Sequence, residues 1–218
     1  RIFNGAVDNA SGTSGLLELA RAYGQAPRTE RSIVMISFTA EESGLLGAEY
    51  YASNPVYPLA KTVGGFNMDS MNVYGRVTGL GVTGYGQSDF DERLAAAIQP
   101  QGRTLVPDHE NAAGTYYRSD HFPLAKRGVP MAYAGSKGDF RDDPIAERQA
   151  ARSEYGANRY HQAADEWSPD WDYSGMMEDL TIFYDVGRDL ANSRDWPEWK
   201  SGSEFGPVRA ETAAQRQP

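Results

Sequence analysis

The sequence predicts an α/β protein with a three-layer α/β/α fold around a mixed, mostly parallel central sheet. Apolar and β-branched runs predict buried strands at 33–39, 63–68 and 77–83. Helical patterns lie before, between and after these runs, as in chains that build layered α/β domains. Carboxylates directly follow two of the strands, and the carboxyl ends of strands are where open α/β sheets bind ligands. A single crevice at that edge is therefore the expected place for a functional site.

Composition narrows the class of protein. The 218 residues are 40% hydrophobic and 23% charged, which is ordinary for one globular domain with a substantial core. The net charge of −9 gives a nucleic-acid partner no electrostatic support. No apolar run approaches the roughly 20 residues of a transmembrane helix, so we expect no membrane insertion. The absence of cysteine excludes disulfides and thiolate metal ligands.

The first predicted helix, at 14–23, follows a loop that is dense in turn-forming residues, from Asn4 to Gly12. Asp8 lies in this loop, just before the helix begins. One interpretation is a helix cap, a role that Asp, Asn and Ser all fill well. The loop offers more potential caps than one helix can use, which favours a site at Asp8.

Glu41 and Glu42 follow the predicted strand 33–39 and precede a predicted helix at 45–52. Adjacent carboxylates at a strand end can divide the work of a metallohydrolase, because one binds a metal while the other stays free as a general base. The alternative is a solvated acidic turn, since the first turn of a helix favours negative charge.

Three further polar residues fall in loops or at strand ends. Asp69 closes the predicted strand 63–68, where a lone Asp is usually a cap or a turn residue. His109 has no metal-ligand partner nearby in the sequence and is expected on the surface. His161 follows a polar stretch at 135–159, which we expect to be a long functional or mobile loop.

The remaining expected elements are a helix at 89–98, a short helix ending at 126, a strand at 128–133 and a long amphipathic helix at 173–193. The catalytic domain is expected to cover 1–208, incomplete at its N-terminus, with a flexible tail at 209–218. No internal repeat or linker divides the chain into two domains.

Together, the candidate site residues are four carboxylates and one imidazole: Asp8, Glu41, Glu42, Asp69 and His161. Connections that follow the strands of a doubly wound sheet converge on one crevice, so these side chains are expected to meet there. Carboxylate and imidazole ligands suit zinc without thiolates, and a bridging carboxylate suits two metal ions.

Five spaced motifs occur in this order in a known family: Asn4-Gly-Ala-Val-Asp8-Asn-Ala-Ser-Gly12, Thr39-Ala-Glu41-Glu42-Ser-Gly-Leu-Leu-Gly47, Asn67-Met-Asp69-Ser, Arg118-Ser-Asp-His-Phe122 and Tyr160-His161-x-x-x-Asp165. Over 1–209, the chain resembles the co-catalytic zinc aminopeptidases, metallopeptidases related to glutamate carboxypeptidase and glutaminyl cyclase. The resemblance implies a fold of the zinc-exopeptidase type that lacks its N-terminal strands here.

The resemblance also implies metal sites for two zinc ions. Asp8 would bridge the two ions, and the peptide bond after it is often cis in the family. Glu42 and His161 would complete one site, and Asp69 would belong to the other. Glu41 would be the general base, which takes a proton from the attacking water and passes it to the leaving amine.

Five other residues have implied roles around the metals. Tyr160 and Arg118 occupy positions from which they could hydrogen-bond the developing oxyanion. Asp120 and His121 are expected to support the site without touching the metal. Asp165 is expected to orient His161 or its loop, as carboxylates behind metal ligands often do.

One metal ligand is missing from this chain. The family takes a histidine for the Asp69 site from a His-x-Asp motif upstream of the Asp8 loop, and this chain begins just before that loop. The Asp8/Glu42/His161 site is thus complete, whereas the Asp8/Asp69 site lacks its histidine. We expect a missing N-terminal segment, a partner chain or a homodimer to complete the fold.

The leading functional expectation is a zinc exopeptidase, most simply an aminopeptidase that hydrolyses N-terminal residues from peptides. The first alternative is a glutaminyl cyclase-like enzyme with a single zinc held by Asp, Glu and His, although the Leu-Leu-Gly47 continuation looks like the peptidases. The second is an inactive fragment or a non-catalytic binding module. Relatives suggest a secreted or periplasmic protein, but this chain carries no signal peptide. Candidates for lining the substrate pocket are the stretch 135–159 and three aromatic residues, Tyr116, Tyr117 and Trp167.

Overall fold

Among the described residues, 3–107 and 114–216 of a computed structural model, four strands form one sheet in the order β1-β4-β2-β3. Their bounds are β1 (Gly65–Asn67), β2 (Val77–Thr83), β3 (Thr104–Pro107) and β4 (Met131–Phe140). β1 runs parallel to β4 and β2 runs parallel to β3, whereas β2 and β4 are antiparallel. The predicted mixed, mostly parallel sheet is confirmed. The expectation for His109 lies outside the described residues.

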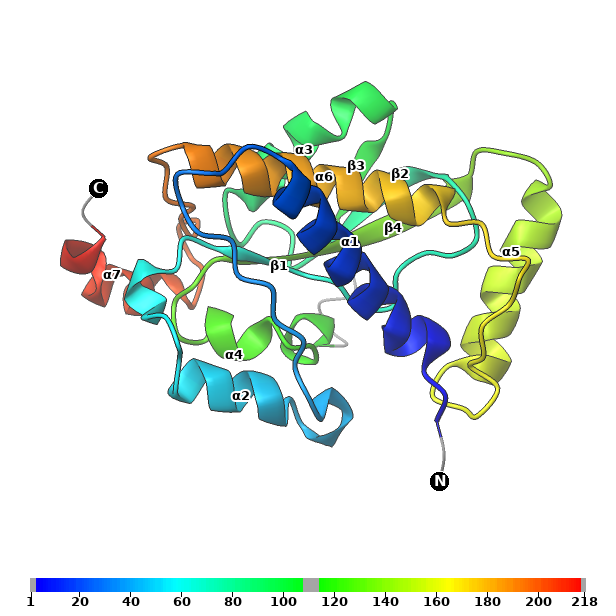
Figure 1. The fold of residues 1–218 in the computed structure, drawn as a ribbon, viewed down its shortest axis with the longest axis horizontal. Coiled ribbons are helices and arrows are strands. Elements are labelled where there is room, and N and C mark those ends of the chain that lie inside the picture. Colours follow the sequence, from blue (N-terminus) through cyan, green and yellow to red (C-terminus); the bar gives the residue numbers. More distant parts are fainter. Residues whose placement is uncertain (1–2, 108–113, 217–218) are drawn as a thin grey trace.

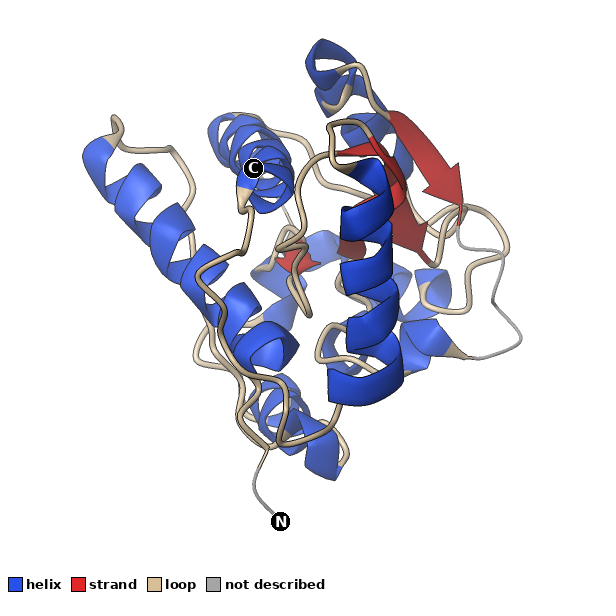
Figure 2. Ribbon diagram, turned by 90° about the vertical axis from the view of Figure 1, so that its right-hand side faces the viewer, coloured by secondary structure: helices blue, strands red, loops and turns tan. Residues whose placement is uncertain are grey.

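Helices cover both faces of the sheet (Figure 1). On one side pack α1 (Gly12–Gln25), α3 (Phe90–Ala97) and α6 (Ser174–Asn192); on the other lie α2 (Leu46–Ser53) and α4 (Phe122–Ala125). The largest buried cluster joins the first three helices to the strands, and a smaller one joins α2 to α4. Figure 2 shows the strands between the helical layers, so the three-layer prediction holds. None of the described helices is long and apolar enough to cross a bilayer.

α6 shows how the sequence pattern builds the core. Its buried apolar residues recur three or four positions apart, which places them along one face of the helix: Met176, Leu180, Phe183, Val186 and Leu190. The polar exception on this face is Asp179, which is 1% exposed. Its Oδ1 lies 2.7 Å from Nη1 of Arg103, and its Oδ2 accepts a hydrogen bond from the backbone N–H of Ser136. Arg103 also donates to the carbonyl of Gly79, so the pair ties α6 to β2 and β4.

Removing one partner of this buried ion pair should lower the free energy of unfolding more than breaking an exposed ion pair does. We expect Arg103→Met to lower the free energy of unfolding by about 3–5 kcal/mol, because it leaves the Asp179 carboxylate buried without its counter-charge. Arg21→Met, which breaks the exposed pair with Glu18, is the matched control and should leave the free energy of unfolding nearly unchanged, because water screens that pair. Denaturant unfolding measures the stability of both variants. Equal losses of stability would contradict a stabilising role for the buried Arg103–Asp179 pair.

The predicted strand at 33–39 is wrong. This segment is extended, but it carries no strand assignment and shows no pairing with a described strand. Its nearest sheet edge, β1, is separated from it by a cavity that both segments line. A strand is defined by its hydrogen-bonded neighbour, so the right composition alone cannot make this segment one.

The expected loop at 135–159 is also wrong. β4 continues to Phe140 because it pairs with β2 along its length, and α5 (Ile145–Glu154) follows. α5 buries no side chain, which explains why its pattern carried no helical signal. Ionic and polar contacts hold it instead: Arg148 bonds both Asp172 and the carbonyl of Tyr74.

The expected tail at 209–218 begins in ordered structure. Arg209 lies in α7 (Gly206–Glu211) and is 2% exposed. Its guanidinium donates to the carbonyls of Thr62 and Val63 and lies 5.5 Å from the ring centre of Trp196. This buried arginine, bonded through both terminal guanidinium nitrogens, anchors this end of the chain, which composition alone does not reveal.

Candidate functional site

The candidate residues converge on one cleft of about 680 Å³ at the carboxyl edge of the sheet. Asp8 comes from the turn before α1, and Glu41 and Glu42 form a helical turn before α2. Asp69 directly follows β1, and His161 follows the irregular turn after α5. Tyr160 and Arg118 line the same cleft. The sheet and its connections thus bring together segments up to 153 residues apart, from Asp8 to His161.

Asp8, Glu42 and His161 form the tightest group in this cleft. Nε2 of His161 lies 3.0 Å from Oδ2 of Asp8 and 2.9 Å from Oε1 of Glu42. One ligand atom from each residue lies within 4.8 Å of the other two. One imidazole nitrogen and two carboxylate oxygens around a shared point are a donor set that zinc accepts. The chemistry of the donors and their convergence therefore fit a metal ion.

Asp165 holds the Asp8 loop rather than the His161 ring. Its buried carboxylate accepts hydrogen bonds from the backbone N–H groups of Val7, at 2.9 Å, and Asp8, at 3.0 Å. The backbone N–H of Ala6 donates to the carbonyl of Asp165, which adds a third tie. The peptide bond between Asp8 and Asn9 is cis, as the resemblance implies. Two candidate segments distant in sequence are thereby locked together.

Asp69 has a support that sequence reasoning missed. Oγ of Ser119 donates to Oδ2 of Asp69 at 2.8 Å and accepts a hydrogen bond from Nδ2 of Asn67 at 2.7 Å. Ser119 is 4% exposed. The sequence does contain an indication of this role, because Ser119 stands between Arg118 and Asp120 in one of the motifs of the resemblance.

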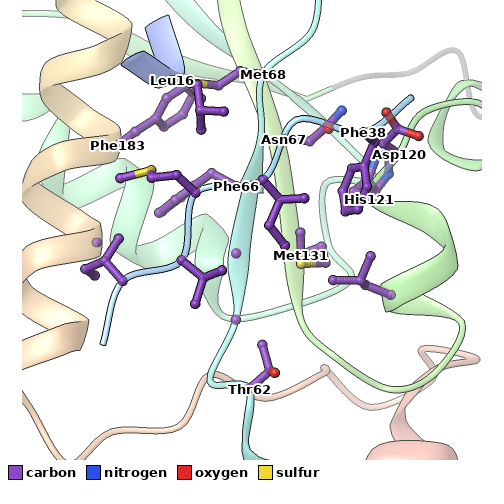
Figure 3. A pocket seen from close by; sticks show the side chains of 18 of the residues that line it. Leu16, Phe38, Thr62, Phe66, Asn67, Met68, Asp120, His121, Met131 and Phe183 are labelled. Carbon is purple, nitrogen blue, oxygen red and sulfur yellow. The ribbon is translucent and has the colours of Figure 1, made fainter. Parts of the chain in front are cut away.

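Asp120 and His121 line the neighbouring cavity beside β1 rather than this cleft (Figure 3). His121 is 1% exposed, and its ring packs edge-on against Tyr116. Burial lowers the pKa of His121 to about 3, so the ring is neutral. Burial, and then the charge of Asp69, raises the pKa of Asp120 to about 6.

Of the three aromatic residues expected to line the substrate pocket, only Tyr117 lines the cleft. Tyr116 packs in a buried aromatic cluster, and Trp167 is 64% exposed and donates to the hydroxyl of Tyr173. Tyr160 instead stacks on His161, with ring centres 3.8 Å apart. The stacked ring restricts how the imidazole can turn.

The cleft makes its own carboxylates hard to ionise. Burial, followed by the charges of Asp69 and Glu42, raises the pKa of Glu41 to about 7. The same causes, in the same order, raise the pKa of Asp8 to about 6. Crowded carboxylates with no cation among them repel each other, and a bound cation would relieve this repulsion.

Without added metal, the chain should be more stable at pH 5 than at pH 8. The pKa values of Glu41 and Asp8 are higher in the folded chain than in the unfolded one, so the fold favours the protonated forms. That stabilisation is complete below the unfolded pKa values and is lost as the pH rises through about 6 to 7. We expect Tm to fall by about 3–6 °C between pH 5 and pH 8.

Calorimetry in a chelating buffer measures this dependence. The double variant Asp8→Asn, Glu41→Gln removes both titrating groups and should flatten it. A Tm that rises between pH 5 and pH 8 in the wild-type chain would contradict the assignment.

Comparisons with known proteins identify relatives of this chain. Aminopeptidase YwaD of Bacillus subtilis is 42% identical over 132 residues, which cover 59% of this chain and 28% of that protein. A probable glutamate carboxypeptidase of Arthroderma benhamiae is 26% identical over 232 residues, covering 90% of this chain and 32% of that protein. The structure of the LapA aminopeptidase of Legionella pneumophila superposes with a TM-score of 0.63 at 21% identity, covering 88% of this chain and 48% of that one.

These matches have two consequences. The LapA likeness confirms the α/β fold, and this chain spans about a third of its curated relatives and about half of that structure. The model of peptidase family M28 matches residues 2–184, which is most of the chain. With the fold, the ordered motifs and this match in agreement, the chain belongs to peptidase family M28.

Proposed function

We propose that this chain is the catalytic part of a zinc-dependent aminopeptidase, which removes N-terminal residues from peptides. The observation that carries the proposal is the convergence of Asp8, Glu42 and His161 beside Glu41 in one cleft. Family membership supports a peptidase, and relatives named as aminopeptidases favour release from the N-terminus. We expect the parent protein to be secreted or periplasmic, as the resemblance suggests.

Asp8, Glu42 and His161 would hold the zinc ion. A neutral imidazole and two carboxylates supply three protein ligands, which leaves a fourth position open for chemistry. When bound, zinc makes water acidic enough to act as a nucleophile near pH 7 and polarises the scissile carbonyl. Asp69 would contribute with Asp8 to a second ion, whose histidine is expected from outside these residues.

Glu41 would move the proton. Its carboxylate lines the cleft but is not part of the three-residue ligand group, so it is free to accept a proton from the attacking water. It would then pass that proton to the amine that leaves when the peptide bond breaks. A general base works best with a pKa near the working pH, and burial, the largest cause of the raised pKa of Glu41 in the metal-free cleft, acts in that direction.

Tyr160 and Arg118 would stabilise the oxyanion that forms as water adds to the carbonyl. Both line the cleft, and hydrogen-bond donors directed at a developing negative charge are among the larger contributions to catalysis. The acidic surroundings favour a substrate that arrives with a positively charged amine. A free peptide N-terminus is such a group.

Release of p-nitroaniline tests the function. We expect the zinc-loaded chain to hydrolyse aminoacyl-p-nitroanilides, and N-acetylated versions of the same compounds should be inert because they lack the amine. A single-zinc cyclase-like enzyme, favoured by the complete Asp8/Glu42/His161 set, would instead cyclise N-terminal glutamine. If both activities are absent, in this chain and in a longer form that supplies the expected histidine, both enzymes are excluded. The binding-module alternative would then remain.

Asp165→Asn should weaken zinc binding although Asp165 is not a proposed ligand. The amide can accept only through its oxygen, so one of the two backbone N–H bonds to Val7 and Asp8 is lost and the Asp8 loop loosens. We expect zinc affinity to fall about 10–100-fold, measured by competition with a chromophoric chelator. Asp170→Asn, an exposed position five residues on, should leave the affinity unchanged. Equal affinities in the two variants would contradict this role.

A further inference from the structure

α5 lies at the edge of the molecule and buries no side chain of its own (Figure 1). Polar contacts fasten it to the rest of the fold, since Arg148 donates to Asp172 at 2.7 Å and to the carbonyl of Tyr74 at 2.6 Å. A helix of 10 residues is marginal on its own in water, so these contacts fix where the helix lies. They thereby also fix the place of Tyr155, the residue that directly follows it.

Tyr155 connects the end of α5 to the candidate site. It is partly buried, whereas the three residues that follow it are exposed. Its ring centre lies 6.5 Å from that of Tyr74 and 6.2 Å from that of Tyr160, both within the range in which aromatic rings attract each other. The backbone N–H of Tyr160 also donates to the carbonyl of Tyr155, at 2.9 Å. Tyr155 therefore packs between a residue bonded to α5 and a residue that lines the cleft.

The ring of Tyr160 in turn contacts the ring of His161. The two rings are stacked, with centres 3.8 Å apart and an angle of 25° between their planes. The rings of Tyr74, Tyr155, Tyr160 and His161 thus form one continuous series of contacts, called the aromatic row below. The imidazole at the end of this row is the proposed nitrogen ligand of the zinc ion.

His161 depends on neighbours for its position, because its own segment lies on the surface. Its side chain is 44% exposed, and residues 162–164 are exposed as well. Its φ of +56° lies in the left-handed region, which residues with a Cβ rarely adopt. A metal ligand has to stay close to one geometry, and packing by neighbouring side chains is what fixes it there. Asp165 ties down the chain that follows His161, and the aromatic row supports the ring from the preceding side.

The hydroxyl of Tyr155 contributes less than its ring. Its oxygen lies 3.4 Å from Oδ2 of Asp165, which is long for a hydrogen bond between two oxygens. The same Oδ2 accepts the shorter bond from the backbone N–H of Asp8, at 3.0 Å. Burial, followed by the charge of Asp165, raises the pKa of Tyr155, so the hydroxyl keeps its proton and adds no charge. The ring contacts are therefore expected to carry the effect of Tyr155 on the site.

We propose that Tyr155 is a positioning residue for the metal site: its ring holds the ring of Tyr160 against His161, and α5 fixes the place of Tyr155. This role rests on the proposed function, since it requires His161 to be a metal ligand. It extends the site beyond the cleft, because Tyr155 does not line the cleft and belongs to none of the five motifs. It also gives a purpose to a helix that adds nothing to the apolar core.

Zinc affinity, measured by competition with a chromophoric chelator, tests the proposal. Tyr155→Ala removes the ring and should lower the affinity about 10–100-fold, the range typical of residues that support metal ligands. Tyr155→Phe keeps the ring, so its affinity should stay within about threefold of the wild-type value. Tyr155→Leu keeps apolar bulk without a flat ring and should lose as much affinity as the alanine variant. It takes the place of that variant if the alanine substitution prevents folding.

Two controls separate positioning from a general loss of stability. Tyr173→Ala also removes a tyrosine that contacts two aromatic residues, Trp167 and Trp171, and it should leave the zinc affinity unchanged. Cobalt(II) in place of zinc gives an absorption spectrum that depends on the geometry of its ligands. Tyr155→Ala should shift that spectrum, whereas Tyr155→Phe and Tyr173→Ala should reproduce the wild-type spectrum.

A double-mutant cycle tests whether Tyr155 acts through Tyr160. In a chain that already carries Tyr160→Ala, the ring between Tyr155 and His161 is gone. Tyr155→Ala should then lower the zinc affinity by less than about threefold further, because residues that act through one contact are not additive. Additive losses would mean that Tyr155 acts by another route and would overturn the proposal.

The outcomes also distinguish this role from the proposed function. If the wild-type chain does not bind zinc, the proposed metal site is wrong, and the role of Tyr155 is wrong with it. If the wild-type chain binds zinc and Tyr155→Ala binds it equally well, only the role of Tyr155 is wrong. A loss in Tyr155→Phe as large as in Tyr155→Ala would assign the effect to the hydroxyl and Asp165, and would overturn the role of the ring.

Discussion

Glu41→Gln should lower kcat on an aminoacyl-p-nitroanilide by about 10³-fold, since the amide cannot accept the proton of the attacking water. The substitution keeps the size of the side chain and adds no charge, so the cleft should keep its shape. Zinc affinity should change little, because Glu41 is not among the three converging ligands. Initial rates with zinc in excess measure the first effect, and chelator competition measures the second.

Comparing the rate and the zinc affinity of Glu41→Gln shows whether Glu41 is a base or a ligand. A loss of zinc affinity that matches the loss of rate would make Glu41 a ligand rather than a base. Glu18→Gln is the matched control, because Glu18 lies on the surface of α1 and forms an ion pair with Arg21. It should retain full activity.

His161→Ala should reduce zinc affinity by more than about 100-fold, since it removes the only proposed nitrogen ligand of the group. Activity at limiting zinc should disappear with it. Raising the zinc concentration should restore only part of the rate, because the remaining two carboxylates hold the ion in poorer geometry. Titration of the metal-free variant gives the affinity directly.

Tyr160→Phe distinguishes the role of Tyr160 from that of the metal ligand His161. The phenylalanine ring can keep the stack on His161, so zinc affinity should stay within about threefold of the wild-type value. The lost hydroxyl should lower kcat by about 10²-fold if Tyr160 donates to the oxyanion. Unchanged kcat in Tyr160→Phe would contradict a catalytic role for Tyr160. Unchanged zinc affinity in His161→Ala would contradict the proposed metal site.

The sequence predicted which motif residues lie together in the cleft. Asp8, Glu41, Glu42, Asp69 and His161 were expected in one crevice, and all five line the same cleft. This worked because strand-end loops converge on one edge, so local patterns are enough to bring distant residues together. Their individual roles stay predictions until the variants are measured.

Other features depend on contacts that no local pattern encodes. The segment 33–39 has the composition of a strand but lacks a paired neighbour, and α5 is held by Arg148 and Arg152 rather than by an apolar face. Asp165 is expected to orient His161 or its loop, and its carboxylate in addition bonds the backbone N–H groups of Val7 and Asp8, which the sequence did not indicate. Partners more than 150 residues away in sequence are invisible to periodicity.

Crystallography at the zinc absorption edge tests the central claim most directly. Crystals of the chain grown with equimolar zinc should show their strongest anomalous peak about 2.0–2.1 Å from Nε2 of His161, with carboxylate oxygens of Asp8 and Glu42 also bound to the ion. That result would establish the metal site on which the proposed peptidase activity rests. A strongest peak elsewhere, or one that lacks His161 as a ligand, would contradict the account.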